Sequence, residues 1–150
     1  MINVYGQQFY DFDGNKVIEN DSIQYIYILY ADPCCSACVK NLLVYCQELK
    51  QATSRLQILF VLKDEMAEYT SKRWAMESVY MYGDTIPIVF DHLKNKSQSI
   101  VLRKKIKEFP CVLLVEKEKK QSLYIPYSQI FTDEGLNIEF MITLSKFLYE

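Results

Sequence analysis

The chain alternates between short apolar runs and longer segments in which apolar residues recur every three or four positions. The apolar runs are rich in β-branched and aromatic residues, which is typical of strands. They predict strands at Gln24–Tyr30, Leu56–Leu62, Ile86–Phe90, Cys111–Val115 and Ser122–Tyr127. The three- and four-residue spacing predicts helices at Ser36–Gln51, Asp64–Tyr82, Lys96–Lys107 and Asp133–Tyr149. Strands that alternate with helices predict an α/β protein whose sheet is covered on both faces.

A hairpin is predicted before the first buried strand. The segments Gln7–Asp11 and Lys16–Ile18 flank Asp13-Gly14-Asn15. An Asp-Gly pair between two such segments is a strong local signal for a tight β-turn. We therefore expect a β-hairpin at the N-terminal side of the sheet.

Length and composition indicate one well-packed domain over residues 1–150. The 150 residues are 50% hydrophobic and contain only four Gly and four Pro, which excludes collagen-like and disordered chains. The formal net charge is −2, so nothing in the overall charge points to nucleic acid or to a membrane surface. The lysine-rich run Arg103–Lys107 is expected to be a solvated face.

Two further patterns bear on the cellular location. No stretch of about 18 uninterrupted apolar residues occurs, so no membrane-spanning segment is predicted. Residues 1–7 lack the basic start and the apolar run of a signal peptide. The compartment stays open: periplasm or cell envelope if a leader has been removed, and cytoplasm otherwise.

Candidate chemistry is concentrated in the cysteines. The chain has five of them, and Cys34, Cys35 and Cys38 lie together between a predicted strand and a predicted helix. Five cysteines are too few for a small domain held together by disulfides, and a chain of this length does not need such support. Thiol reactivity or metal binding is the better explanation for the cluster.

Cys35-Ser36-Ala37-Cys38 is a C-x-x-C motif at the predicted start of a helix. Positions three apart lie on the same helix face, so the two sulfurs come within reach of a disulfide. Unpaired backbone N–H groups and the positive end of the helix dipole stabilise the Cys35 thiolate, which makes Cys35 the expected nucleophile. Cys38 lies deeper in the helix and is expected to attack the mixed disulfide and release the product.

The order of elements around this motif resembles the thioredoxin fold, and more closely its redoxin branch of the TlpA/ResA type. The resemblance implies a mixed central sheet flanked by helices, with an N-terminal hairpin and an insertion before a cis-proline strand. It also implies a thiol–disulfide oxidoreductase that acts on protein or small-thiol disulfides and exchanges electrons with a redox partner protein. The redox-active disulfide would be its only cofactor. By the same resemblance, Pro110 is the cis-proline that faces the disulfide and helps to bind the substrate.

Cys34 leaves the register of the motif open. Counted from Tyr30-Ala31, the first family cysteine falls on Cys34, and the spacing Cys34-x-x-x-Cys38 resembles the Sco-type copper chaperones. Those chaperones also need a distant histidine, and His92 is the single histidine of this chain. We predict Cys35, Cys38 and Pro110 as the catalytic residues, and keep Cys34 as the alternative partner of Cys38.

Two other classes of function remain possible from the sequence. One is a non-catalytic thioredoxin-like interaction module, and the other is a carrier that binds copper, zinc or an iron–sulfur cluster through thiolates. Cys34, Cys35, Cys38 and Cys111 would suit such a metal if the fold brought them together. Because a second C-x-x-C is absent, we assign no metal ligand.

The remaining candidates have simpler structural explanations. Cys46 follows Cys38 by eight residues on the apolar helix face, where a cysteine is usually a small buried hydrophobe. Cys111 is expected to face the core from its strand, with a third redox thiol as the alternative. His92 is expected to lie in a loop.

Overall fold

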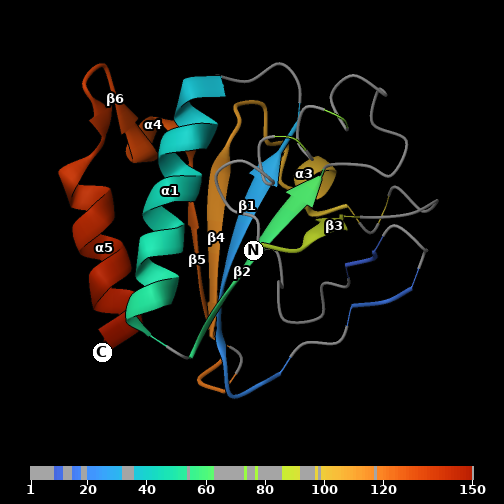
Figure 1. Ribbon diagram of the computed structural model, residues 1–150. Coiled ribbons are helices and arrows are strands. Elements are labelled where there is room, and N and C mark those ends of the chain that lie inside the picture. Colours follow the sequence, from blue (N-terminus) through green and yellow to red (C-terminus); the bar gives the residue numbers. More distant parts are fainter. Residues whose placement is uncertain are drawn as a thin grey trace.

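A computed structural model of the protein describes residues 9–11, 15–17, 20–31, 36–53, 55–62, 73, 77, 86–91, 97, 99–116 and 118–149. Five strands form its central sheet, in the order β3-β2-β1-β4-β5 (Figure 1). Their bounds are β1 Gln24–Tyr30, β2 Leu56–Leu62, β3 Ile88–Phe90, β4 Cys111–Glu116 and β5 Gln121–Ile125. β1 pairs parallel with β2 and antiparallel with β4, so the sheet is mixed. The predicted mixed central sheet is confirmed.

Helices cover both faces of this sheet. α1 (Ser36–Ala52) and α5 (Ile138–Tyr149) lie together on one side, and the short α3 (Ile100–Arg103) lies on the other (Figure 1). The predicted apolar stripe of α1 is buried, and Leu42 and Leu43 have no exposed surface. Because both faces are covered, the three inner strands are apolar along nearly their whole length.

The region after β5 differs from the prediction. The predicted strand Ser122–Tyr127 ends at Ile125 because Pro126 follows and has no backbone N–H to donate. A short helix, α4 (Tyr127–Ile130), and a hairpin of β6 (Phe131–Thr132) and β7 (Gly135–Leu136) come next.

The C-terminal helix is therefore shorter than the predicted Asp133–Tyr149. Gly135 has φ +124°, which a helix does not accommodate, and it forms part of the hairpin turn. Asn137 caps the start of α5, because its side-chain oxygen accepts a hydrogen bond from the Glu139 N–H at 2.9 Å.

The predicted helix Lys96–Lys107 is reduced to the four residues of α3 among those described. Ser99 caps its start by accepting a hydrogen bond from the Leu102 N–H. Its first N–H groups also need acceptors, and the buried carboxylate of Asp91 accepts from Ile100 and Val101. The helix ends at Lys104, and Lys105 follows with φ 56°.

The N-terminal hairpin is seen in part. Tyr10 forms antiparallel bridges with Lys16 and with Phe90, so this segment also pairs with β3 at the edge of the sheet. The Phe9 side chain is fully buried and packs edge-on against Tyr27, with 4.8 Å between the ring centroids. Asp13 and Gly14 of the predicted turn lie outside the described residues.

Of the predicted helix Asp64–Tyr82, the structure describes only Arg73 and Glu77. Both are helical, and the Arg73 Nε donates to the Glu77 carboxylate at 3.0 Å. In the described part of the chain, no helix combines the length and the apolar character that crossing a membrane requires.

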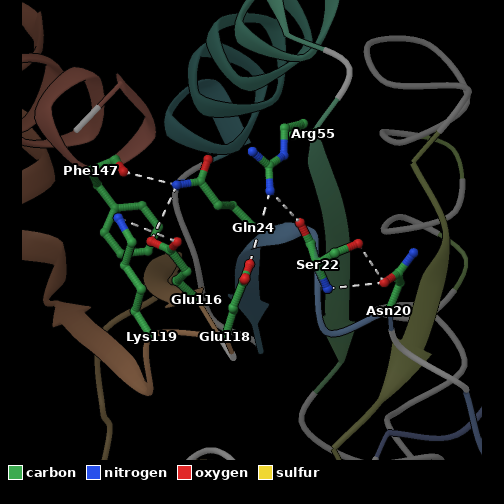
Figure 2. Close-up of polar contacts among 8 residues, drawn as sticks. All are labelled: Asn20, Ser22, Gln24, Arg55, Glu116, Glu118, Lys119 and Phe147. Atoms are coloured by element: carbon green, nitrogen blue, oxygen red, sulfur yellow. Dashed lines mark hydrogen bonds and ion pairs between the residues drawn. The ribbon is translucent and has the colours of Figure 1, made fainter.

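Polar contacts tie α5 to the sheet at the end where β1 begins (Figure 2). The Gln24 Nε2 donates to the Phe147 backbone carbonyl at 3.0 Å and to the Glu116 carboxylate at 3.4 Å. Just before the neighbouring strand β2, the Arg55 guanidinium donates to the Ser22 carbonyl and lies 4.0 Å from the Glu118 carboxylate. The Arg55–Glu118 pair is exposed and contributes little to stability.

Candidate functional site

The candidate site lies at the end of the sheet where β1 finishes and α1 begins. β1 ends at Tyr30 and α1 starts at Ser36, so the cysteine motif spans this strand-to-helix connection. Cys34, Cys35 and Asp32 lie outside the described residues. Cys38 is the third residue of α1, in the first helical turn, where backbone N–H groups have no partner within the helix.

Cys38 is half-buried and disulfide-bonded. The other two cysteines described, Cys46 and Cys111, are free thiols. The Cys38 Sγ also contacts the Tyr127 hydroxyl oxygen at 3.3 Å.

Pro110 is brought to the same end of the sheet by the pairing of β1 with β4. The antiparallel register pairs Leu29 with Cys111, so Pro110, which directly precedes Cys111, lies at the end of the sheet where β1 ends. The Phe109–Pro110 peptide bond is cis, as the family resemblance implies. Pro110 is buried and directly precedes the first residue of β4. A role for Pro110 in binding a substrate stays a prediction.

Cys46 and Cys111 face the core, as the sequence predicts. Neither has exposed surface. Burial raises the pKa of the Cys46 thiol to about 12, because the thiolate would lose its hydration. Burial also raises the pKa of Cys111 to about 12, although a hydrogen bond from Tyr124 opposes the shift. Both side chains are therefore neutral thiols at ordinary pH, which makes them poor nucleophiles and poor metal ligands.

The structure also bears on the predicted basic face and on metal binding. His92 lies outside the described residues. Arg103, Lys104, Lys105 and Lys107 are exposed, in agreement with a solvated basic face. The residues that the structure describes include no cluster of three or more potential metal ligands.

Tyr127 is the residue of this site that sequence reasoning missed. The sequence pattern predicts it at the end of a strand, but it begins α4 and reaches the first turn of α1. A signal was present in Pro126, which ends β5 at the end of the sheet where Pro110 precedes β4. The contact itself joins residues 89 positions apart, and no local pattern encodes such a contact.

Solved structures similar to this one are thioredoxin-like. The thioredoxin domain of a thiol–disulfide oxidoreductase from Bacteroides vulgatus has a TM-score of 0.62 and 18% sequence identity, over 93% of this chain and 91% of that one. A thioredoxin-like protein from Aeropyrum pernix has a TM-score of 0.62 and 11% identity, over 95% and 89%. A putative thiol:disulfide interchange protein DsbE from Chlorobium tepidum has a TM-score of 0.58 and 13% identity, over 94% and 89%.

No protein-family model and no curated protein sequence matches the chain. At such low identities, the structural matches establish the fold and nothing more specific. The chain has a thioredoxin-like fold, and this sequence prediction is confirmed.

Proposed function

We propose that the protein is a thiol–disulfide oxidoreductase whose redox pair is Cys35 and Cys38. The observation that carries the proposal is the disulfide-bonded state of Cys38 in the first turn of α1. With Cys46 and Cys111 free, Cys34 and Cys35 are the two candidates for its partner. The C-x-x-C spacing favours Cys35, because three residues make nearly one helical turn.

The proposed reaction transfers two electrons. The Cys35 thiolate attacks one sulfur of a substrate disulfide, a mixed disulfide forms, and the other substrate sulfur leaves as a thiolate that takes a proton from water. The Cys38 thiolate then attacks the Cys35 sulfur, which forms the Cys35–Cys38 disulfide and releases the second substrate thiolate. The substrate is reduced, and the pair is oxidised until a redox partner returns the electrons.

The position of Pro110 supports a substrate site at this end of the sheet. Pro110 lies beside the end of β1, and α1 starts only a few residues after that end. Following the resemblance to redoxins, we assign Pro110 to the surface that holds an extended thiol or disulfide substrate. The pair needs no cofactor besides its own disulfide.

Single-cysteine variants test the proposed reaction. Cys35→Ser and Cys38→Ser are each expected to abolish catalytic reduction of insulin disulfides by dithiothreitol, because each removes one half of the pair. Cys46→Ala is the matched control, since Cys46 is a buried free thiol on the same helix. Wild-type activity in the Cys35→Ser variant, with the control also active, would show that the assignment is wrong.

Peptide mapping of the oxidised protein tests the pairing separately. Mass spectrometry is expected to find Cys35 bonded to Cys38 in the wild type, and Cys34→Ser is expected to leave that bond and the activity in place. A Cys34–Cys38 bond, together with loss of activity in Cys34→Ser, would move the redox pair to the longer spacing.

A further inference from the structure

Tyr127 places a hydroxyl group on the sulfur of the proposed resolving cysteine. The distance from the Tyr127 hydroxyl oxygen to the Cys38 Sγ is 3.3 Å, within the range for hydrogen bonds to sulfur. A disulfide-bonded sulfur carries no proton, so the tyrosine is the donor in this state. Nothing in the proposed reaction so far uses this contact.

The fold holds the Tyr127 ring in place. Figure 1 shows α4 and the β6–β7 hairpin beside the first turn of α1. The ring lies 4.9 Å from the Phe131 ring between centroids, and Phe131 is paired with Leu136 in the hairpin. The preceding residue, Ile130, has no exposed surface, and its carbonyl accepts a hydrogen bond from the Asn137 N–H at 2.8 Å. The hydroxyl is thus presented by a packed element.

We propose that the Tyr127 hydroxyl stabilises the Cys38 thiolate during the second step of the reaction and so makes Cys38 a more available nucleophile. This inference rests on the proposed function. A hydroxyl that donates to a thiolate favours the charged form, as any hydrogen bond to a charged group does. The thiol proton of Cys38 passes to water before the attack, and the Tyr127 hydroxyl only donates the hydrogen bond.

The size of the effect follows from thiol chemistry. Loss of a hydrogen bond to a charged sulfur is expected to weaken the acidity of Cys38 about tenfold. The thiolate of a less acidic thiol is a stronger nucleophile. Because the Brønsted coefficient is about 0.4–0.5, a tenfold loss of acidity makes the thiolate about threefold more reactive. Removal of the hydroxyl therefore makes Cys38 slower at low pH and faster at high pH.

The test isolates Cys38 in the full-length chain. In a Cys34→Ser, Cys35→Ser background, the remaining cysteines besides Cys38 are Cys46 and Cys111, which have no exposed surface. The rate of exchange with 5,5′-dithiobis(2-nitrobenzoate) is then measured against pH, with and without Tyr127→Phe. The midpoint of the profile is expected to rise by about one pH unit, with rates about threefold lower below it and about threefold higher above it.

Two further variants separate the hydroxyl from the packing of the ring. Tyr127→Leu removes the ring as well, and is expected to give the same shift as Tyr127→Phe. Tyr45→Phe is the matched control, because Tyr45 also lies on α1 but its hydroxyl is hydrogen-bonded to Ser145 of α5, and the variant is expected to leave the profile unchanged. An unchanged profile in Tyr127→Phe, or a shift seen only in Tyr127→Leu, overturns the proposal.

Failure of the proposed function would look different. In that case the wild type lacks disulfide reductase activity, although the crossing pH profiles in the Cys34→Ser, Cys35→Ser background are still found. If the wild type is active, single-turnover decay of its mixed disulfide at neutral pH is expected to slow about threefold in Tyr127→Phe. An active enzyme with unchanged decay contradicts the role of Tyr127 and leaves the redox pair in place.

Discussion

The side chains of Tyr124 and Cys111 are hydrogen-bonded to each other. Cys111 is the first residue of β4 and directly follows the cis-proline, Pro110. Burial raises the pKa of Tyr124 above its ordinary range, and the neighbouring Cys111 adds to the shift. The Lys104 ammonium lies over the Tyr124 ring, 4.6 Å from its centre. Cys111 is therefore a buried, neutral thiol hydrogen-bonded to a neutral phenol, which argues against Cys111 as a third redox thiol.

The buried thiols predict a loss of stability at alkaline pH. Cys46 and Cys111 keep their protons in the folded protein up to about pH 12, whereas the same thiols in the unfolded chain ionise near 9.0. Between these values unfolding releases protons, so the free energy of unfolding falls as pH rises, by up to about 1.4 kcal/mol per thiol for each pH unit. Urea unfolding of the reduced protein at several values between pH 8 and pH 11 measures this slope.

Cys46→Ala provides the control for that slope. The loss of packing is the same at every pH and by itself only lowers the whole curve, so any change of slope comes from the missing thiol. The pH-dependent part is expected to lose the contribution of one thiol, while Cys111 and Tyr124 still contribute. An unaltered slope in Cys46→Ala would contradict the burial argument for Cys46.

Thiol labelling is expected to divide the cysteines into two groups. In the reduced, folded protein, iodoacetamide at about pH 8 should modify Cys38 and leave Cys46 and Cys111 unmodified, because the buried pair is neutral and has no exposed surface. In urea both buried thiols should react. Peptide mass spectrometry reads each site separately, and rapid labelling of Cys111 in the folded state would restore it as a candidate redox residue.

The central strands and α1 could be predicted because their local pattern and their burial agree. Gln24–Tyr30 and Leu56–Leu62 are continuous apolar runs, and both are inner strands with the predicted bounds. Phe131–Leu136 could not be assigned in this way, because the spacing of Leu136, Phe140 and Leu144 also fits a helix. The positive φ of Gly135 and the Asn137 hydrogen bond at the start of α5 separate the hairpin from the helix.

Part of the candidate site could be predicted from local sequence signals, and part could not. The C-x-x-C motif and Pro110 carry recognisable local signals, and the cis form of Pro110 follows the resemblance. Tyr127 carries no such signal, because its contact with Cys38 depends on how β5, α4 and α1 pack. Contacts between distant segments are decided by tertiary packing, which a pattern of neighbouring residues does not contain.

Asp91 is expected to be a major contributor to stability. Its carboxylate is fully buried and accepts hydrogen bonds from the Ser99 hydroxyl and from the N–H groups of Ile100 and Val101. Asp91→Ala would leave these donors buried without that acceptor, and should lower the free energy of unfolding by about 3 kcal/mol. Chemical denaturation followed by circular dichroism measures the loss.

Two variants calibrate the result for Asp91. Ser99→Ala removes the cap of α3 and one of the three hydrogen bonds to the Asp91 carboxylate, but leaves the carboxylate in place, and should cost about 1 kcal/mol. Asp133→Ala lies in an exposed turn and should change stability by less than about 0.5 kcal/mol. If Asp91→Ala cost no more than Ser99→Ala, the carboxylate would be a minor cap and not a central buried acceptor.

Gly135 is expected to tolerate no side chain without strain. A Cβ atom at this position would meet no other atom within 4 Å, so the cost of Gly135→Ala comes from the backbone, whose φ of +124° is rare for residues with a side chain. The free energy of unfolding should fall by about 1–3 kcal/mol. Glu134→Ala, in the same exposed turn, is the control and should be nearly neutral.

Because the β6–β7 hairpin also holds Phe131 against Tyr127, amide exchange in α4 should speed up in Gly135→Ala and not in the control. A Gly135→Ala variant as stable as the wild type would mean that the turn readily adopts another backbone conformation.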